Sequence, residues 1–155
     1  MIRPREATHD DVEEMVAFGQ EFWHQTGYYK QGVAYDATAI ALLTHHLIDT
    51  GIVLVAMDAD RVVGILLMVM GPMPFNPLAI CATEIVYYVA PAYRKGGLGV
   101  RILHKAEKVA KSKNVKYVSM VLLASVEPEK PAAVYKRLGY EQTETAFTKD
   151  LKSWQ

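Results

Sequence analysis

Residues 89–99 read VAPAYRKGGLG, and they join a strand pattern to a helix pattern. The residues before it, 78–91, are rich in branched and aromatic side chains, which is typical of a strand that stops at Pro91. After it, apolar residues recur at helical spacing from Val100 onward. A glycine-rich turn from a strand into a helix leaves backbone N–H groups unpaired at the positive end of the helix. Such a turn favours binding of an anion such as phosphate.

The spacing alone leaves two interpretations of this turn open. In the first, Gly96 and Gly97 let the backbone approach a phosphate closely. Arg94 and Lys95 would then add positive charge, Arg94 as a fork of donors and Lys95 as a mobile point charge. In the second, the glycines only solve a tight junction between a strand and a helix.

Two familiar phosphate-binding patterns do not fit the turn. The Walker pattern requires a Lys-Ser or Lys-Thr pair after its final glycine, whereas Gly99 is followed by Val100 and Arg101. The dinucleotide fingerprint requires a third glycine where Ile102 stands. Both classes of site are therefore disfavoured.

The rest of the chain alternates between strand and helix patterns. Turn residues at 58–60 separate two β-rich runs and predict an antiparallel hairpin, whereas the three prolines within 71–77 predict a loop. The predicted order is strand 2–6, helix 8–27, helix 36–51, strands 52–58 and 61–70, strand 78–91, helix 99–111, strand 116–124, helix 131–138 and strand 140–151. This order predicts an α/β sandwich around a mixed sheet.

Size and composition set outer limits on the function. A chain of 155 residues with 51% hydrophobic and 22% charged residues fits a single domain over 1–155. Its 17 basic and 17 acidic residues balance, so no overall field favours a membrane or a nucleic acid. The apolar setting of the lone Cys81 fits a buried, inert thiol in a reducing compartment. The start lacks the apolar segment of a signal peptide, so a cytoplasmic protein is predicted.

Two motifs carry a family resemblance. The stretch 89–99 resembles motif A of the GCN5-related N-acetyltransferases, whose signature is Arg or Gln, two residues, Gly, one residue, and Gly or Ala. Arg94, Gly97 and Gly99 fill that signature. The stretch 132–151, AAVYKRLGYEQTETAFTKDL, is similar to motif B, with Tyr135 in its helix. The resemblance covers essentially the whole chain. It implies a three-layer α/β sandwich whose mixed, largely antiparallel sheet is splayed between strands 4 and 5.

The resemblance also implies acetyl-CoA as cosubstrate and direct acyl transfer to an amine. The strand end before the turn would pair with the pantetheine arm, and the N–H of its last residue would stabilise the oxyanion. The Tyr135 hydroxyl would protonate the departing thiolate; the alternative is that Tyr135 only packs in the core. The implied pantetheine contacts are Tyr87, Tyr88 and Val89, and the implied pyrophosphate contacts are Arg94, Lys95, Gly96, Gly97, Leu98, Gly99 and Val100.

One position departs from the family pattern. Many members carry an asparagine seven residues before the tyrosine, and Pro128 stands there instead. A side-chain contact to the arm is therefore lost, and Ser125 is a weak substitute. The stretch 125–131, SVEPEKP, indicates a remodelled loop near the arm or the acceptor.

Acyl transfer also requires a base, because an ammonium must lose a proton before it attacks a thioester. Glu84 is the candidate, since it lies in an apolar run where burial would raise its pKa toward neutrality. The alternative is a glutamate that faces solvent or pairs with a nearby base. No metal site is predicted from the five histidines, because their spacing matches no ligand set.

The acceptor site is expected near the connection between the first two helices. Its walls would come from the aromatic residues of 23–35 and from the proline-rich loop, namely Trp23, Tyr28, Tyr29, Tyr35, Met73 and Phe75, each of which could equally be packing. The connection itself contains Lys30 and no acid, so a polycationic acceptor is not specially favoured. The basic residues of 101–116 favour a solvated helix face over a nucleic-acid surface.

Two functions of different class remain open. The first is an acetyl-CoA-dependent N-acetyltransferase that acts on an amine of a small molecule or a protein. The second is a non-catalytic cofactor-binding or interaction module in which Glu84 and Tyr135 only pack. The predicted terminal strand, within 140–151, would also allow pairing with a second copy in a homodimer.

Overall fold

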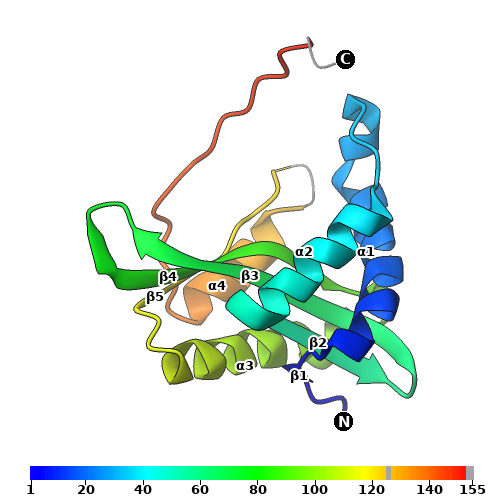
Figure 1. Ribbon diagram of the computed structural model, residues 1–155, viewed down its shortest axis with the longest axis horizontal. Coiled ribbons are helices and arrows are strands. Elements are labelled where there is room, and N and C mark those ends of the chain that lie inside the picture. The colour runs from blue at the N-terminus through cyan, green and yellow to red at the C-terminus, as the bar shows by residue number, and fades with distance from the viewer. Residues whose placement is uncertain (125–126, 153–155) are drawn as a thin grey trace.

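The computed structural model describes residues 1–124 and 127–152. These residues form a five-stranded sheet with the order β1-β2-β3-β4-β5 (Figure 1). Neighbouring strands are antiparallel except β4 and β5, which run parallel. The strands are β1 Arg5–Glu6, β2 Ile52–Asp58, β3 Arg61–Met73, β4 Asn76–Val89 and β5 Tyr117–Ser119. The prediction of a mixed, largely antiparallel sheet is confirmed.

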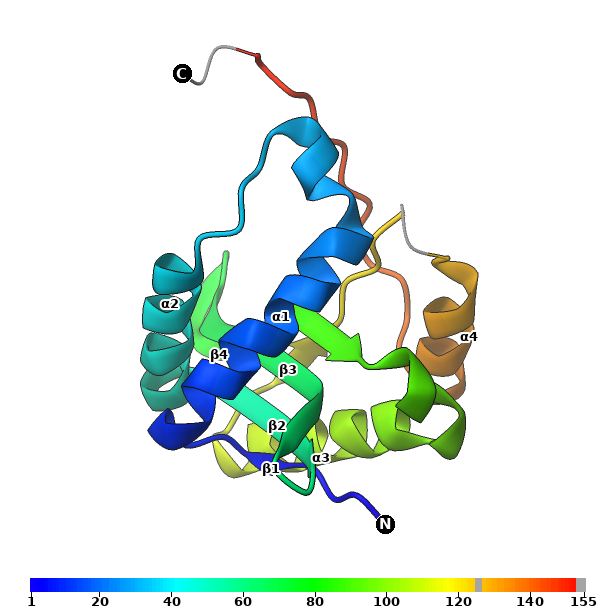
Figure 2. The same ribbon diagram turned by 90° about the vertical axis from the view of Figure 1, so that its right-hand side faces the viewer.

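Helices cover both faces of the sheet, as Figure 2 shows for α1 and α2 on one side and α3 and α4 on the other. The helices are α1 Val12–Thr26, α2 Ala37–Thr50, α3 Leu98–Ser112 and α4 Glu129–Arg137, and short 3-10 turns lie at His9–Asp11, Tyr28–Gln31 and Pro91–Gly96. The Tyr140 hydroxyl, just beyond α4, donates to Glu107 Oε1 of α3 at 3.0 Å. Helices, sheet and helices thus form the predicted three layers.

The central strands are buried on both faces. Leu66 packs with Ile102 of α3, whereas its neighbour Ile65 packs with Met15 of α1. Successive side chains of a strand point to opposite faces, so a strand covered on both sides reads as a nearly continuous apolar run. Residues 62–68, VVGILLM, have this pattern. The core therefore consists of two apolar layers separated by the sheet.

Local signals fix the helix ends as predicted. Gly27 ends α1 with φ of 78°, a left-handed conformation that costs glycine no steric strain. The Asp36 carboxylate caps α2 by accepting a hydrogen bond from the Ala39 N–H at 2.9 Å. The motif A helix and the motif B helix both form at their predicted places.

The predicted loop at 71–77 is wrong. β3 continues to Met73 and β4 starts at Asn76, so only a tight turn separates the two strands. Within the described residues, β2 pairs with β3 no further than Met68 and β5 pairs with β4 only at 81–83. The outer part of the hairpin therefore has two strands, each with an open edge. A proline can occupy such an edge because its missing N–H is not needed there.

The strand predicted over 116–124 is shorter than expected and is not covered on both faces. It pairs with β4 only from Tyr117 to Ser119. Beyond Ser119, the Val121 N–H donates to the Glu84 carboxylate at 2.9 Å, so a side chain rather than a continued ladder joins this segment to β4. β4 nevertheless continues to Val89, so the predicted splay between the fourth and fifth strands is present.

The predicted strand at 140–151 does not form. This segment leads away from the sheet in an extended course (Figure 1). Its apolar side chains stay in solvent, with Phe147 94% exposed. The reason is geometric: β5 offers an edge of only three residues, too short to hold a long strand.

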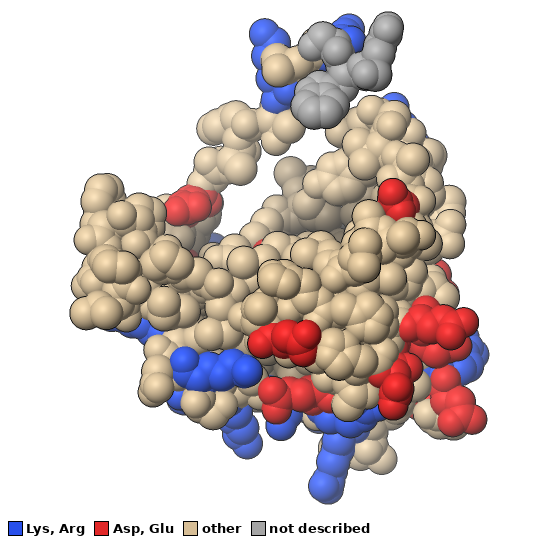
Figure 3. All heavy atoms as spheres, viewed as in Figure 1, with Lys and Arg blue, Asp and Glu red and all other residues tan. Residues whose placement is uncertain are grey.

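Charged side chains gather at the lower part of Figure 3, over α3 and the start of α1, whereas the β3–β4 hairpin at the left shows none. The basic face of α3 is partly structural. The Arg101 guanidinium donates to the carbonyls of Gly96 at 2.7 Å and Ile2 at 3.2 Å, so it holds the motif A turn and the N-terminal segment together.

In the described part of the chain, no helix has the length and apolar run needed to cross a membrane.

Candidate active site

The pairing register between β3 and β4 directs some backbone groups of β4 toward the gap between β4 and β5. The Ala90 N–H donates to the carbonyl of Val63 in β3 at 2.9 Å, so Ala90 and Val63 form a hydrogen-bonded pair. Hydrogen-bonded and non-bonded pairs alternate in an antiparallel ladder. The N–H and C=O groups of Val89, and of Tyr87 two residues earlier, therefore point away from β3. They face the side on which β5 has already separated from β4.

A β-bulge at Ile85 sets the side-chain directions. Val86 pairs with Leu67 and Glu84 pairs with Met68, so Ile85 has no opposite residue. The extra residue shifts the alternation by one position. The bulge turns Glu84 to the same side of the sheet as Tyr87, although two residues stand between them in sequence.

Glu84 is a buried carboxylate, 8% exposed, with one backbone partner. Its Oε2 accepts the hydrogen bond from the Val121 N–H. Burial raises the pKa of Glu84 to about 7, and the hydrogen bond opposes this rise. The pKa thus lies where a general base operates at neutral pH.

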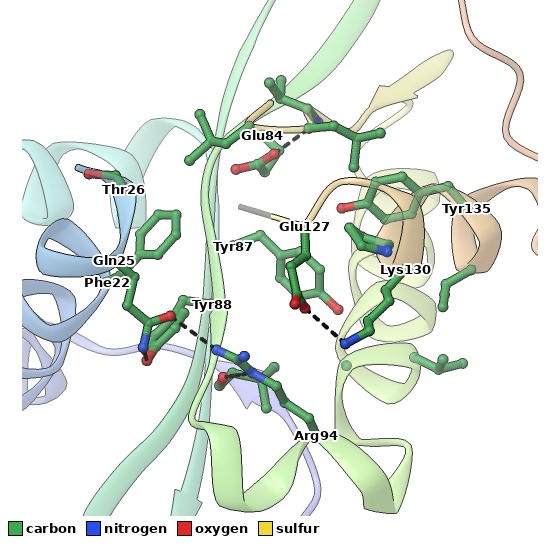
Figure 4. Close-up of a pocket in the computed structure, with 18 of the residues that line it drawn as sticks. Phe22, Gln25, Thr26, Glu84, Tyr87, Tyr88, Arg94, Glu127, Lys130 and Tyr135 are labelled. Carbon is green, nitrogen blue, oxygen red and sulfur yellow. Dashed lines mark hydrogen bonds and ion pairs between the residues drawn. The ribbon is translucent and has the colours of Figure 1, made fainter. Parts of the chain in front are cut away.

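Tyr135 of α4 faces the same cleft. Figure 4 shows Glu84, Tyr87 and Tyr135 directed toward one space between β4 and α4. Tyr135 is 6% exposed, and burial, followed by the charge of Glu84, raises the pKa of its phenol well above the usual value. Burial, again followed by Glu84, raises the pKa of Tyr87 to about 12. Both phenols therefore carry their protons at neutral pH.

The motif A turn exposes the N-terminus of α3. Gly97 has φ of 71°, and no side chain of the described residues caps the helix that begins at Leu98. A Cβ at Gly99 would lie 2.6 Å from the Tyr87 hydroxyl, so a side chain there would require Tyr87 to shift. The first N–H groups of α3 are thus left without side-chain partners, next to the open end of β4.

Arg94 connects the turn to α1. Its Nε donates to the Val89 carbonyl at 2.8 Å, and its Nη2 donates to Gln25 Oε1 at 3.3 Å. The guanidinium carbon lies 5.4 Å from the centre of the Tyr88 ring, and the Tyr88 hydroxyl accepts from Gln25 Nε2 at 2.7 Å. Arg94 therefore holds the end of β4 and the C-terminal part of α1 in one network.

These elements enclose a cleft of about 590 Å³. The cleft brings together most predicted site residues: Glu84, Tyr87, Tyr88, Val89, Arg94, Gly97, Gly99, Val100 and Tyr135. Lys95 and Gly96 are exposed to solvent and do not line the cleft. Leu98 does not line it either, because it is buried in the core between α3 and the sheet.

The central part of the chain matches a known protein family. A family profile described as an acetyltransferase (GNAT) domain matches residues 49–142, which include β2, the hairpin, the motif A turn and α4. The chain belongs to the GNAT acetyltransferase family. A comparison with curated proteins finds no match.

Solved structures share the GNAT fold at low sequence identity. A predicted acetyltransferase from Clostridium acetobutylicum, solved with acetyl-CoA, has a TM-score of 0.73 at 16% identity over 97% of both chains. An acetyltransferase from Trypanosoma brucei has a TM-score of 0.69 at 18% identity, over 97% of this chain and all of its own. The aminoglycoside acetyltransferase AAC(6')-Iy, in complex with a bisubstrate analog, has a TM-score of 0.74 at 12% identity, over 98% and 99% of the two chains.

The GNAT cleft includes residues that sequence reasoning missed. From α1 come Phe22, Gln25 and Thr26, and from the segment after β5 come Val121, Leu122 and Leu123. Phe22 has the helical spacing of a core residue, so no local signal separates it from the core. Glu127 and Lys130 also line the cleft, paired at 2.8 Å, within the stretch predicted to be remodelled. Pro128 precedes α4 as its N-cap residue, and Ser125 lies outside the described residues.

Most predicted acceptor walls lie elsewhere. Tyr28 lines the cleft, but Trp23, Tyr29, Tyr35, Met73 and Phe75 do not. Trp23 Nε1 donates to the Val33 carbonyl at 3.0 Å, and the Tyr35 hydroxyl donates to the Val16 carbonyl at 2.6 Å. These two side chains therefore fasten the loop between α1 and α2 and have a packing role.

Proposed function

We propose that this protein transfers an acetyl group from acetyl-CoA directly to a primary amine at the open end of β4. The observation that carries the proposal is the convergence of buried Glu84 and Tyr135 on one cleft beside the uncapped N-terminus of α3. The family match supports acetyl transfer in general. The acetyl-CoA in the Clostridium acetobutylicum structure supports this cosubstrate.

The backbone supplies the groups that acetyl-CoA needs. N–H groups at the start of α3 would bind the pyrophosphate, with Gly97 and Gly99 allowing close approach. The outward N–H and C=O groups of Tyr87 would bind the pantetheine arm as an added strand, whereas the Val89 carbonyl already accepts a hydrogen bond from Arg94. The Val89 N–H would stabilise the oxyanion that develops at the thioester carbonyl. Arg94 would add positive charge beside the phosphates.

The side chains supply the proton transfers. The Glu84 carboxylate takes a proton from the acceptor ammonium, directly or through a water molecule. The free amine attacks the thioester carbonyl carbon, a C–N bond forms, and the C–S bond breaks. Tyr135 donates its phenolic proton to the leaving thiolate, and the proton that the nitrogen loses as it becomes an amide restores the phenol. The amine attacks the thioester directly, so no covalent bond to the protein is needed.

The test is release of free CoA thiol in the presence of acetyl-CoA and pooled primary amines. Amine-dependent release is expected, with loss of release in Glu84→Gln and Tyr135→Phe variants that still bind acetyl-CoA. Binding of acetyl-CoA without release from any amine would instead support a non-catalytic binding module and overturn the proposed catalysis.

A further inference from the structure

The cleft has two halves that come from opposite layers of the fold. One half is formed by the start of α3 and by α4, and it contains the backbone groups assigned above to acetyl-CoA. The other half is formed by the end of α1, the turn after it, the β4 bulge and the segment after β5. Figure 4 shows this division, with Phe22, Gln25 and Thr26 across β4 from Tyr135 and Lys130. Glu84 lies between the two halves.

We propose that the α1 half of the cleft selects a small primary monoamine with an aromatic or branched aliphatic body. This inference rests on the proposed acetyl transfer and specifies its acceptor. The ammonium would lie at Glu84, and the body would lie against Phe22, Ile85 and Leu122.

Charge in the cleft matches one ammonium. Among the described lining residues, the carboxylates are Glu84 and Glu127, and Glu127 is already paired with Lys130 at 2.8 Å. A second ammonium group would lose water without gaining an anionic partner. Polyamines and aminoglycosides are therefore poor acceptors.

The walls favour an apolar body. The Phe22 ring stacks on the Tyr88 ring, with 5.1 Å between centroids and 24° between planes. Gln25 fixes the Tyr88 hydroxyl, so this aromatic wall is held before a ligand arrives. Ile85 lines the cleft at the bulge yet remains 40% exposed. Leu122, from the segment after β5, also leaves apolar surface uncovered in the cleft. A ligand body that covers these surfaces would be stabilised by the hydrophobic effect.

The same walls disfavour a lysine side chain of a protein. Lysine offers one ammonium, but the peptide groups of its protein would meet apolar lining side chains such as Ile85 and Leu122. Peptide N–H and C=O groups placed against apolar side chains lose hydrogen bonds with water. A free small amine carries no such groups, so it fits the apolar half better.

The test compares acceptors at saturating acetyl-CoA by thiol release. Phenethylamine and isoamylamine are the apolar monoamines, and the comparison set is putrescine, spermidine, neamine and a blocked lysine amide. The expected kcat/KM is at least about tenfold higher for the apolar monoamines than for each comparison amine. An Ile85→Asp variant adds a carboxylate to the apolar wall and should shift the preference toward putrescine. Leu42→Asp adds the same charge on α2, where Leu42 is 67% exposed and outside the cleft lining, and should change nothing.

A second readout separates this inference from the proposed function. Thermal unfolding with unreactive CoA and each amine reports binding without catalysis. Higher stability with phenethylamine than with spermidine supports the acceptor class even if no thiol is ever released. Thiol release or stabilisation that ranks putrescine, spermidine, neamine or the lysine amide first overturns the acceptor class while leaving acetyl transfer intact.

Discussion

The Glu84 carboxylate accepts the Val121 N–H at 2.9 Å at the point where β4 and β5 separate. One buried acid thus lies in the opening between the two strands and contacts both of its walls. If Glu84 is the general base, the group that holds Val121 at the cleft wall is also the group that activates the acceptor.

Replacing Glu84 with Gln should keep the cleft open but abolish the base. Glutamine retains a side-chain oxygen for the Val121 N–H, so the splay should persist. We expect kcat/KM to fall by about 10²-fold to 10⁴-fold. Acetyl-CoA affinity, measured by calorimetry, should stay near wild type; a Glu84→Gln protein with full turnover would exclude Glu84 as the base.

The pH dependence of the wild-type protein should carry the signature of Glu84. Its pKa of about 7 means that the carboxylate is protonated below pH 7 and available as a base above it. The groups that face it are the Val121 N–H and the phenols of Tyr87 and Tyr135, and the phenols stay neutral in this range. We expect kcat/KM to rise through pH 7, with this limb missing in Glu84→Gln.

The free energy of unfolding should fall as pH rises, whereas kcat/KM should rise. Burial raises the pKa of Glu84 from 4.5 to about 7, so between these values the folded state binds more protons than the unfolded state. Ionised Glu84 therefore destabilises the fold as pH rises through this window. At pH 8 the penalty is on the order of 3 kcal/mol, and Glu84→Gln should recover much of it. Urea unfolding at pH 5 and pH 8 measures the difference; a variant less stable than wild type at pH 8 contradicts this account.

The phenol of Tyr135 can be tested against a matched control. Tyr135→Phe removes the proposed proton donor and should lower kcat by about 10²-fold with little change in acetyl-CoA binding. Tyr140→Phe removes a neighbouring half-buried phenol that donates to Glu107 and does not line the cleft. Turnover should survive in Tyr140→Phe. Equal turnover in both variants would mean that Tyr135 only packs.

The glycine turn offers a similar pair of variants. Gly99→Ala would place a methyl group 2.6 Å from the Tyr87 hydroxyl, so Tyr87 would have to move within the proposed pantetheine site. A Cβ at Gly96 meets nothing within 4 Å. We expect acetyl-CoA affinity to fall by about tenfold, or ~1.4 kcal/mol, in Gly99→Ala and to hold in Gly96→Ala. Equal affinities would remove the close-approach role assigned to this turn.

Local signals in the sequence predicted most elements and the glycine turn between β4 and α3. Gly27, Asp36 and the motif A glycines act within a few residues of themselves, so their effects can be read along the chain. The bulge at Ile85 and the Glu84–Val121 contact depend on how distant strands meet. Phe22 joins the cleft only because α1 packs beside β4. The terminal strand was wrongly predicted because its residues alternate suitably but find no edge to pair with.

Thermal unfolding of the wild-type protein at increasing acetyl-CoA concentration tests cofactor binding most directly. A ligand that binds only the folded state adds RT ln(1 + [L]/Kd), which is about 2.7 kcal/mol at 100 times Kd. We expect a Tm that rises steadily with acetyl-CoA and rises less in Gly99→Ala. An unchanged Tm at millimolar acetyl-CoA would contradict cofactor binding at the motif A turn and the acetyl transfer built on it.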